Sequence, residues 1–264
     1  MNRLLSAAAV CLTVLLAAPS VSAQPAAESA AVTPGAYVRH TVDGPTVTME
    51  GENATARITA YRPDIVRVDW MRPGAAPDTS YSVIAAPSPE LRPTVVDGDS
   101  ALFVRSGDLT VVANKRPLRL RFAGAEGQPL VAEADSNAVL RDTARTVQFQ
   151  IETDTHFYGT GERKTFGLYG EAFDVYNRAI WNYNEANMTM KLNVPFVSTT
   201  AGYGLFVDNH HPGRFDIGAA DSTEMAYTAQ GGTMTYFVLG GPSIADQIEQ
   251  YTALTGRQPL PPKW

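Results

Sequence analysis

The segment with the most side chains suited to chemistry covers residues 157–173, FYGTGERKTFGLYGEAF. Gly159 and Gly161 are spaced as in a phosphate-binding loop, but no third glycine, no Lys-Ser/Thr pair and no helical pattern follows them. The segment therefore predicts a tight turn that exposes Glu162 and Arg163. Glu162 could act in glycoside chemistry only together with a second carboxylate, and the sequence defines no such partner. Structural pairing of Glu162 with a nearby arginine is the simpler interpretation.

A second segment, residues 174–193 (DVYNRAIWNYNEANMTMKLN), alternates aromatic rings with amides and lacks apolar periodicity. Its candidate binding residues are Asn177, Arg178, Trp181 and Asn182. This composition suits a sugar, because flat rings stack on C–H faces while amides bind hydroxyl groups. Long irregular loops within compact domains are also often functional. The alternative is an asparagine-rich surface turn with Trp181 packed inward, and composition alone does not decide between the two.

The pair His210-His211 in DNHHPGRFD is the best metal-binding candidate, together with Asp208 or Asp216. Adjacent residues of a strand point to opposite faces, which argues against a shared metal. We therefore expect a turn stabilised by Asp208, Asn209 and Pro212. The sequence also lacks the Gly-x-Ser-x-Gly elbow of a serine hydrolase. It predicts no metal site and no cofactor.

The first 23 residues have the pattern of a secretion signal. Arg3 precedes the apolar run of residues 4–18, and small residues end at Ala23, where cleavage is expected. The run is too short to span a bilayer comfortably, so no membrane partner is predicted. The only cysteine, Cys11, lies within this run and would leave with it, so the mature chain has no disulfide. We expect a secreted or periplasmic bacterial protein.

The remaining composition limits both the fold and the partners. The chain has 264 residues, of which 44% are hydrophobic, and a formal net charge of −6, which argues against nucleic acid as a partner. Residues 24–36 predict a flexible leader, and residues 37–256 a domain of short, alternating strands between turns. Such strands are typical of an all-β, antiparallel sandwich or barrel. They are expected at residues 54–71, 101–114, 116–133, 146–152, 193–200, 203–209 and 232–241.

One helix is expected near the end of the chain. Ser243 can cap its first turn together with Asp246, and Gly256 suits the residue that ends it. The helical spacing predicts one buried apolar stripe, formed by Ile244, Ile248, Tyr251 and Leu254. Residues 257–264 (RQPLPPKW) then predict a stiff proline-rich linker toward a further packed unit.

The order of the motifs resembles glycoside hydrolase family 31, the retaining α-glucosidases and α-xylosidases. The series is FYGTGER, the aromatic and asparagine loop, VPF, YGLFVDN, GRFDIG, GGTMTYFVLGGPS and YTALTGRQPLPPKW. The resemblance implies a galactose-mutarotase-like β-sandwich that packs on a (β/α)8 barrel beginning just after residues 257–264. It places the two catalytic aspartates on that barrel, so no catalytic residue is expected in this chain.

The resemblance also implies a role for the loop at residues 177–187, which in the family reaches over the barrel mouth to shape the sugar site. Many members carry an aspartate where this chain has Ala179, so Arg178, Trp181 or Asn182 contact the sugar instead, or the loop is only a wall. The implied partners are a carbohydrate substrate and the barrel, against which an apolar face should lie. The alternatives are a free-standing carbohydrate-binding module and a mutarotase-type isomerase using His156 and Glu162.

Overall fold

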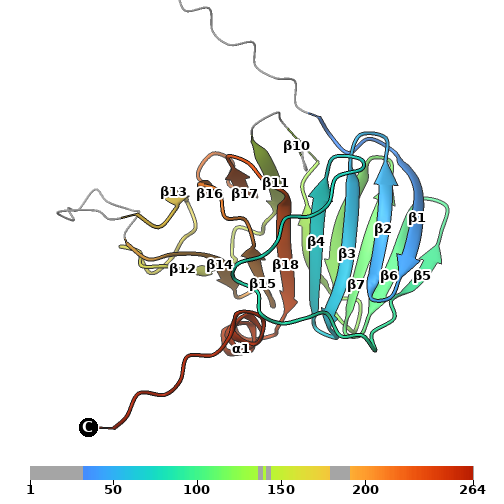
Figure 1. The fold of residues 1–264 in the computed structure, drawn as a ribbon. Helices are drawn as coiled ribbons and strands as arrows, with labels where there is room; N and C mark the ends of the chain where they lie inside the picture. Colours follow the sequence, from blue (N-terminus) through green and yellow to red (C-terminus); the bar gives the residue numbers. More distant parts are fainter. Residues whose placement is uncertain (1–31, 136–138, 141–143, 179–190, 264) are drawn as a thin grey trace, which may run out of the picture.

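The computed structural model describes residues 32–135, 139–140, 144–178 and 191–263. Within these ranges the chain forms two facing antiparallel sheets, with one helix below them in the view of Figure 1. The first sheet contains, in spatial order, β1 (Tyr37–Asp43), β2 (Thr46–Gly51), β3 (Thr55–Arg62), β4 (Ile65–Met71), β18 (Met234–Gly240), β15 (Tyr203–Val207), β14 (Asn193–Thr199) and β12 (Phe157–Gly161).

The second sheet contains, in spatial order, β13 (Glu171–Val175), β16 (Gly213–Ile217), β17 (Glu224–Ala229), β11 (Arg145–Gln150), β9 (Pro129–Glu133), β8 (Leu118–Ala123), β7 (Leu109–Lys115), β6 (Ala101–Ser106) and β5 (Thr94–Asp97). The short β10 (Val139–Leu140) pairs with β11. Every strand pairing in the described part of the chain is antiparallel. The prediction of an all-β antiparallel sandwich is confirmed.

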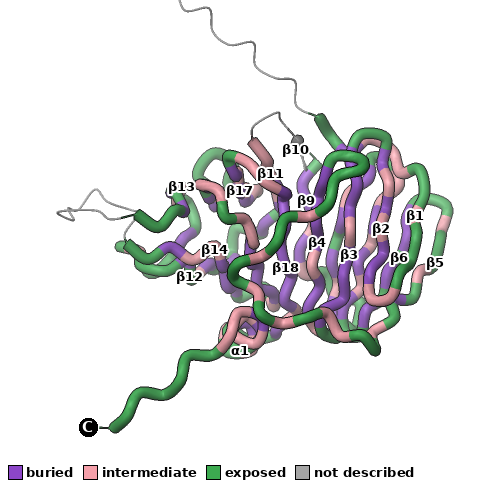
Figure 2. Tube along the Cα trace, viewed as in Figure 1, coloured by how far each residue is buried: buried purple, intermediate pink, exposed green. Residues whose placement is uncertain are grey.

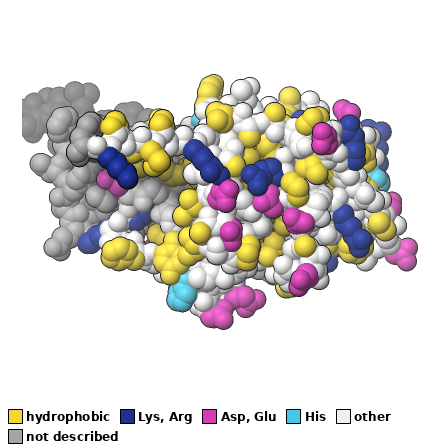
Figure 3. Space-filling view, turned by 90° about the horizontal axis from the view of Figure 1, so that it is seen from below, with side chains coloured by type: hydrophobic (Ala, Val, Ile, Leu, Met, Phe, Trp, Pro, Cys, Tyr) yellow, Lys and Arg dark blue, Asp and Glu magenta, His cyan; other side chains and the backbone are white. Residues whose placement is uncertain are grey.

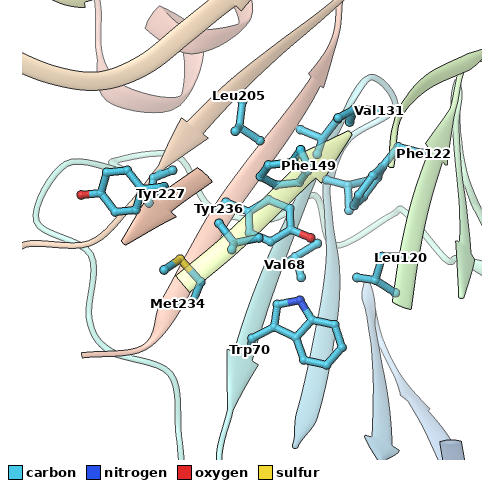
Figure 4. Packing of buried hydrophobic residues seen from close by; sticks show 14 of the residues in the cluster. Val68, Trp70, Leu120, Phe122, Val131, Phe149, Leu205, Tyr227, Met234 and Tyr236 are labelled. Atoms are coloured by element: carbon cyan, nitrogen blue, oxygen red, sulfur yellow. The ribbon is translucent and has the colours of Figure 1, made fainter. Parts of the chain in front are cut away.

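The alternation seen in the sequence determines which side chains enter the core between the sheets. In β8, Leu118, Leu120 and Phe122 are buried while the intervening arginines face outward. Rings from both sheets meet there, and Phe149 of β11 lies edge-on to Tyr236 of β18 with centroids 5.2 Å apart (Figure 4). Figure 2 shows that the buried residues follow the facing strands of both sheets.

A second, smaller core lies on the outer face of the first sheet. It explains why β15 and β18 are buried on both faces rather than alternating. The helix α1 (Ile244–Thr255) and residues 72–93, here called the strap, cover this face (Figure 1). The buried residues of this core are Tyr61, Ile65, Phe196, Phe206, Phe237, Leu239 and Leu254.

The strap has no regular secondary structure and is fixed to the sandwich by hydrogen bonds. Ile84 N and Ala85 N both donate to Leu254 O, at 3.0 and 3.1 Å, near the end of α1. The carboxylate of Asp78 accepts a bond of 2.6 Å from Thr233 N. The bonds from Ile84 and Ala85 satisfy a helix-end carbonyl group that the helix itself leaves without a partner.

Helix α1 confirms the predicted cap but not the predicted buried stripe. Ser243 and Asp246 form a capping box, and Gly256 ends the helix with φ of 98°. Ile248, however, is 48% exposed, whereas Gln247 is fully buried. The amide of Gln247 bonds to Ser198, Thr199 and Gly241. The face of α1 that packs against the end of β14 therefore includes buried polar side chains, whereas the spacing had predicted a purely apolar stripe.

The two ends of the described chain differ in their packing. Thr33 to Ala36, which the sequence assigned to the leader, bond to the turn between β2 and β3 through Asn53 and Glu52. Residues 257–263 are exposed and extend away from α1 without secondary structure (Figures 1 and 2). The expected signal peptide, residues 1–23, lies outside the described residues. No helix in the described ranges is long and apolar enough to cross a membrane.

Candidate functional site

Two of the four predicted sugar-binding residues, Asn177 and Arg178, lie in the described part of the chain, directly after β13. Asn177 is built into the framework, because its Oδ1 accepts a hydrogen bond of 2.6 Å from Asn193 N at the start of β14. Arg178 is exposed. Trp181 and Asn182 lie outside the described residues, so their predicted role stays a prediction.

The Gly-Thr-Gly sequence ahead of Glu162 forms neither a phosphate loop nor the tight turn expected. It belongs to β12, whose pairing with β14 shifts register between Gly159 and Gly161. A Cβ atom on Gly159 would lie 2.6 Å from Phe196 O, and one on Gly161 would meet Leu192 O even more closely. The two glycines therefore serve the close approach of two backbones at a β-bulge.

Arg163 is half-buried rather than exposed as predicted, and it organises the base of the loop. Its Nε donates to Thr160 Oγ1 at 2.9 Å, and its Nη1 donates to Asn193 Oδ1 at 2.7 Å. The guanidinium also lies over the ring of Phe173, 4.3 Å from its centroid. Burial lowers the pKa of Arg163 to about 10, so the side chain keeps its charge at neutral pH.

Glu162 is exposed beside this cluster. Its backbone N donates to Leu192 O at 2.8 Å, and its carboxylate accepts a longer bond of 3.4 Å from Leu192 N. These contacts join the end of β12 to the residue that precedes β14. They give Glu162 a structural part at the base of the loop, and its predicted pairing with an arginine stays a prediction.

A cleft of about 400 Å³ opens between the base of the loop, the strap and the end of β15. This volume is in the range of small-molecule sites. Its rim carries two aromatic rings, since Tyr81 of the strap is 82% exposed and Tyr176 is 48% exposed. The lining includes Tyr81, Ser82, Tyr176, Asn177, Asn193, Phe206, Asp208, Asn209, His210, His211 and Tyr251.

Asp208 is the acidic group of this cleft. Burial raises its pKa, while the hydroxyl of Ser80 and the nearby Arg67 act in the opposite direction. A carboxylate held partly out of water inside a cleft is typical of binding sites. Local sequence patterns do not show this contact, because Ser80 lies on the strap and Asp208 follows β15, far away in the chain.

The two histidines lie in the turn after β15, so the expectation that strand geometry would separate them was wrong. Their rings are 4.7 Å apart, and His210 also meets the edge of Tyr81 at 5.3 Å. The prediction of a stabilised turn holds for Asn209, whose Oδ1 accepts from His211 N at 2.8 Å. Among the described residues, no three His, Cys, Asp or Glu side chains form a group that could hold a metal ion.

The cleft thus combines exposed aromatic rings, an amide and a carboxylate, a set that suits hydroxyl-rich ligands with apolar C–H faces. Sequence reasoning found Asn177, Arg178 and the DNHH turn, but it missed Tyr81 and Asn193. Both residues reach the cleft through contacts between segments far apart in the chain. The fold and site define an antiparallel β-sandwich protein with a polar cleft at the base of a long loop.

Comparison with known proteins gives the family. Residues 55–216 match the model of the glycosyl hydrolase 31 N-terminal galactose mutarotase-like domain. The chain belongs to glycoside hydrolase family 31, and the matched region is its N-terminal domain.

The sequence relatives are much longer than this chain. Alpha-glucosidase 2 of Bacillus thermoamyloliquefaciens is 33% identical over 220 residues, which cover 81% of this chain and 28% of the relative. Alpha-xylosidase XylQ of Lactiplantibacillus pentosus is 31% identical over 176 residues, 63% of this chain and 22% of the relative. The chain therefore spans less than a third of the curated relatives it matches.

Solved structures agree on the fold. A GH31 dextranase of Flavobacterium johnsoniae complexed with isomaltotriose superposes with a TM-score of 0.82 at 23% identity, over 88% of this chain and 29% of that one. A GH31 alpha-xylosidase from a soil metagenome complexed with xylose gives 0.69 at 17% identity, over 85% and 36%.

Proposed function

We propose that this chain is the N-terminal domain of a secreted, retaining α-glycosidase that hydrolyses α-glucosides or α-xylosides. In this proposal the domain supports a (β/α)8 catalytic barrel and lends the cleft and the base of its loop to the sugar site. The chain alone is catalytically inert. The observation that carries the proposal is the position of Asn177, which lines a polar cleft, is held by a bond from Asn193 N and precedes Arg178, in a domain of this family.

The surface supports a docked partner. Large apolar side chains are exposed around the strap, α1 and the C-terminal segment, including Tyr81 at 82%, Ile84 at 75% and Leu260 at 95%. Figure 3 views the molecule from below and shows hydrophobic side chains on this face, interspersed with charged ones. Such exposure is typical of interaction surfaces. The exposed segment at residues 257–263 leaves from this same face, where a following domain would connect (Figure 1).

The first experiment measures the size of the native protein in its source with an antibody against this region. A band far above 28.4 kDa supports the proposal, and a band at that size overturns it. An assay with aryl α-glucoside and aryl α-xyloside then compares the native protein with the 264-residue chain. Activity confined to the longer protein is expected, whereas hydrolysis by the chain alone would contradict its inertness.

A free-standing carbohydrate-binding module is the second candidate, and the exposed rings of Tyr81 and Tyr176 at the rim of the cleft favour it. Calorimetric titration of the chain with isomaltotriose and with xylose tests this function directly. Binding by the isolated chain that is lost in Tyr81→Ala or Trp181→Ala supports the module. If both variants bind sugar with the affinity of the unchanged chain, the result argues against the module.

A further inference from the structure

The two ends of the segment at residues 178–192 are tied together by one buried side chain. Asn193, which is only 5% exposed, donates from Nδ2 to Tyr176 O at 3.1 Å. Its backbone N donates to Asn177 Oδ1 at 2.6 Å, and its Oδ1 accepts from Arg163 Nη1 at 2.7 Å. The donors and the acceptor of this residue thus reach two other segments of the chain, residues 176–177 after β13 and Arg163 after β12.

Arg163 is itself fixed from three directions. Its Nε bonds to Thr160, its Nη1 bonds to Asn193, and its plane lies against Phe173 of β13. Thr160 holds φ at 63°, a conformation that side chains other than glycine seldom adopt. Oγ1 of this residue accepts the bond of 2.9 Å from Arg163 Nε.

We infer that Arg163 and Asn193 are positioning residues: together they set the spacing between residues 176–177, just after β13, and the start of β14. The inference rests on the proposed function, because it explains how Asn177 and Arg178 are held beside the cleft. Neither Arg163 nor Asn193 needs to touch a sugar for this role. Both act through Tyr176 and Asn177.

The chemistry of the pair explains the residue types. The planar guanidinium donates from two nitrogen atoms in fixed directions and stacks on an aromatic face, which a lysine ammonium group does not do. Asparagine supplies an acceptor for Arg163 and a donor for Tyr176 O from one short side chain. Aspartate at position 193 would keep the acceptor but lose that donor. Arg163→Lys keeps the positive charge and Asn193→Asp keeps the size of the side chain, so these variants test the hydrogen-bond geometry.

Trypsin reports on this arrangement, because Arg178 and Lys191 flank the segment and are both exposed. In the 264-residue chain, Arg163→Lys and Asn193→Ala should each raise the rate of cleavage after these two residues about tenfold, the effect of losing one or two hydrogen bonds. Cleavage after Arg257, in the exposed C-terminal segment, serves as the internal reference and should not change.

Matched variants make the test specific. Arg121 Nη2 donates to Asn114 Oδ1 at 3.0 Å on the second sheet, so Asn114→Ala removes a similar pair and should leave cleavage after Arg178 unchanged. Asn177→Asp keeps the acceptor for Asn193 N and should resemble the unchanged protein, whereas Asn177→Leu should resemble Asn193→Ala.

The inference is overturned if Asn193→Ala leaves cleavage after Arg178 and Lys191 unchanged. It is also overturned if cleavage rises equally at all sites, because that would indicate general destabilisation.

Sugar titration of the same variants is a separate readout. If the unchanged chain and the longer native protein bind no sugar, the proposed function fails, while a local rise in cleavage still supports the positioning role.

Discussion

The carboxylate of Glu133 accepts a hydrogen bond of 2.6 Å from the hydroxyl of Tyr236 and one of 2.7 Å from Trp70 Nε1, in the interior between the two sheets. Leu120 N donates to its other oxygen at 2.8 Å. Glu133 lies on β9 of the second sheet, whereas Trp70 and Tyr236, both labelled in Figure 4, lie on neighbouring strands of the first. One buried carboxylate therefore links the two sheets across the core.

This arrangement predicts that Glu133→Leu is strongly destabilising. The substitution leaves an indole, a hydroxyl and a backbone N–H buried without their acceptor, and should lower the free energy of unfolding by about 3 kcal/mol or more. Glu133→Gln keeps one acceptor oxygen and should lose less. Urea denaturation measures both, and Glu126→Leu in an exposed turn is the control. Equal stability of Glu133→Leu and Glu126→Leu would refute the structural role.

Buried tyrosines predict a loss of stability at alkaline pH. Burial raises the pKa of Tyr203, Tyr227 and Tyr236 above the ordinary value of 10.0, and Glu133 adds to the effect at Tyr236. Because the folded pKa values lie above the unfolded ones, the stabilisation is fully present below pH 10 and is lost as pH rises beyond it.

Phenolate absorbance and circular dichroism, followed together as pH is raised, check this expectation. The three buried rings should ionise only as the fold is lost. Ionisation of every tyrosine near pH 10 in a folded chain would contradict it.

The strands and the helix cap were predictable because the signals for them are local. Leu118, Leu120 and Phe122 alternate with arginines in the sequence, and this alternation determines which face of β8 is buried. Ser243 and Asp246 are three residues apart, and the capping box needs nothing else. Where a pattern and its consequence lie within one segment, the sequence is sufficient.

The site was only partly predictable, because its key contacts join distant segments. Asn193 bonds to Arg163, which is 30 residues away in the chain. Periodicity also failed in α1, where the partner of Gln247 is the end of β14 and not solvent. Spacing within a helix does not show whether the surface that it will cover is polar.

Asp208 predicts a gain in stability on removal of its charge. Because burial raises the folded pKa of Asp208 above its unfolded value, ionisation opposes folding. This deficit is present above the folded pKa and disappears below the ordinary value of 3.8. Asp208→Asn should therefore raise the melting temperature at pH 7. The gain in the free energy of unfolding should be no more than about 1 kcal/mol, because the cleft is open to solvent.

Thermal unfolding at pH 7 and at a pH below 3.8 tests the sign, since the advantage of Asp208→Asn should vanish in acid. Asp221 is the matched control, because a bond from Thr223 lowers the pKa of its exposed carboxyl. Asp221→Asn should give no gain at pH 7. A loss of stability in Asp208→Asn at pH 7 would show that the charge itself supports the fold.

Gly159 and Gly161 lie at the β-bulge, and any side chain added there would clash with the backbone of the neighbouring strand. Gly159 has φ of 109°, and a Cβ there would lie 2.6 Å from Phe196 O. Gly159→Ala should therefore lower the free energy of unfolding by about 3 kcal/mol or more, since a backbone carbonyl cannot move aside as a flexible side chain can.

Gly74 is the matched control, with φ of 78° and no heavy atom within 4 Å of the added Cβ. Gly74→Ala carries only the strain of its backbone conformation, about 1 kcal/mol. The difference between the two variants in urea denaturation isolates the close approach of β12 to β14. If both variants lose the same stability, the glycine at position 159 serves only its φ angle, and the bulge does not require the close backbone contact.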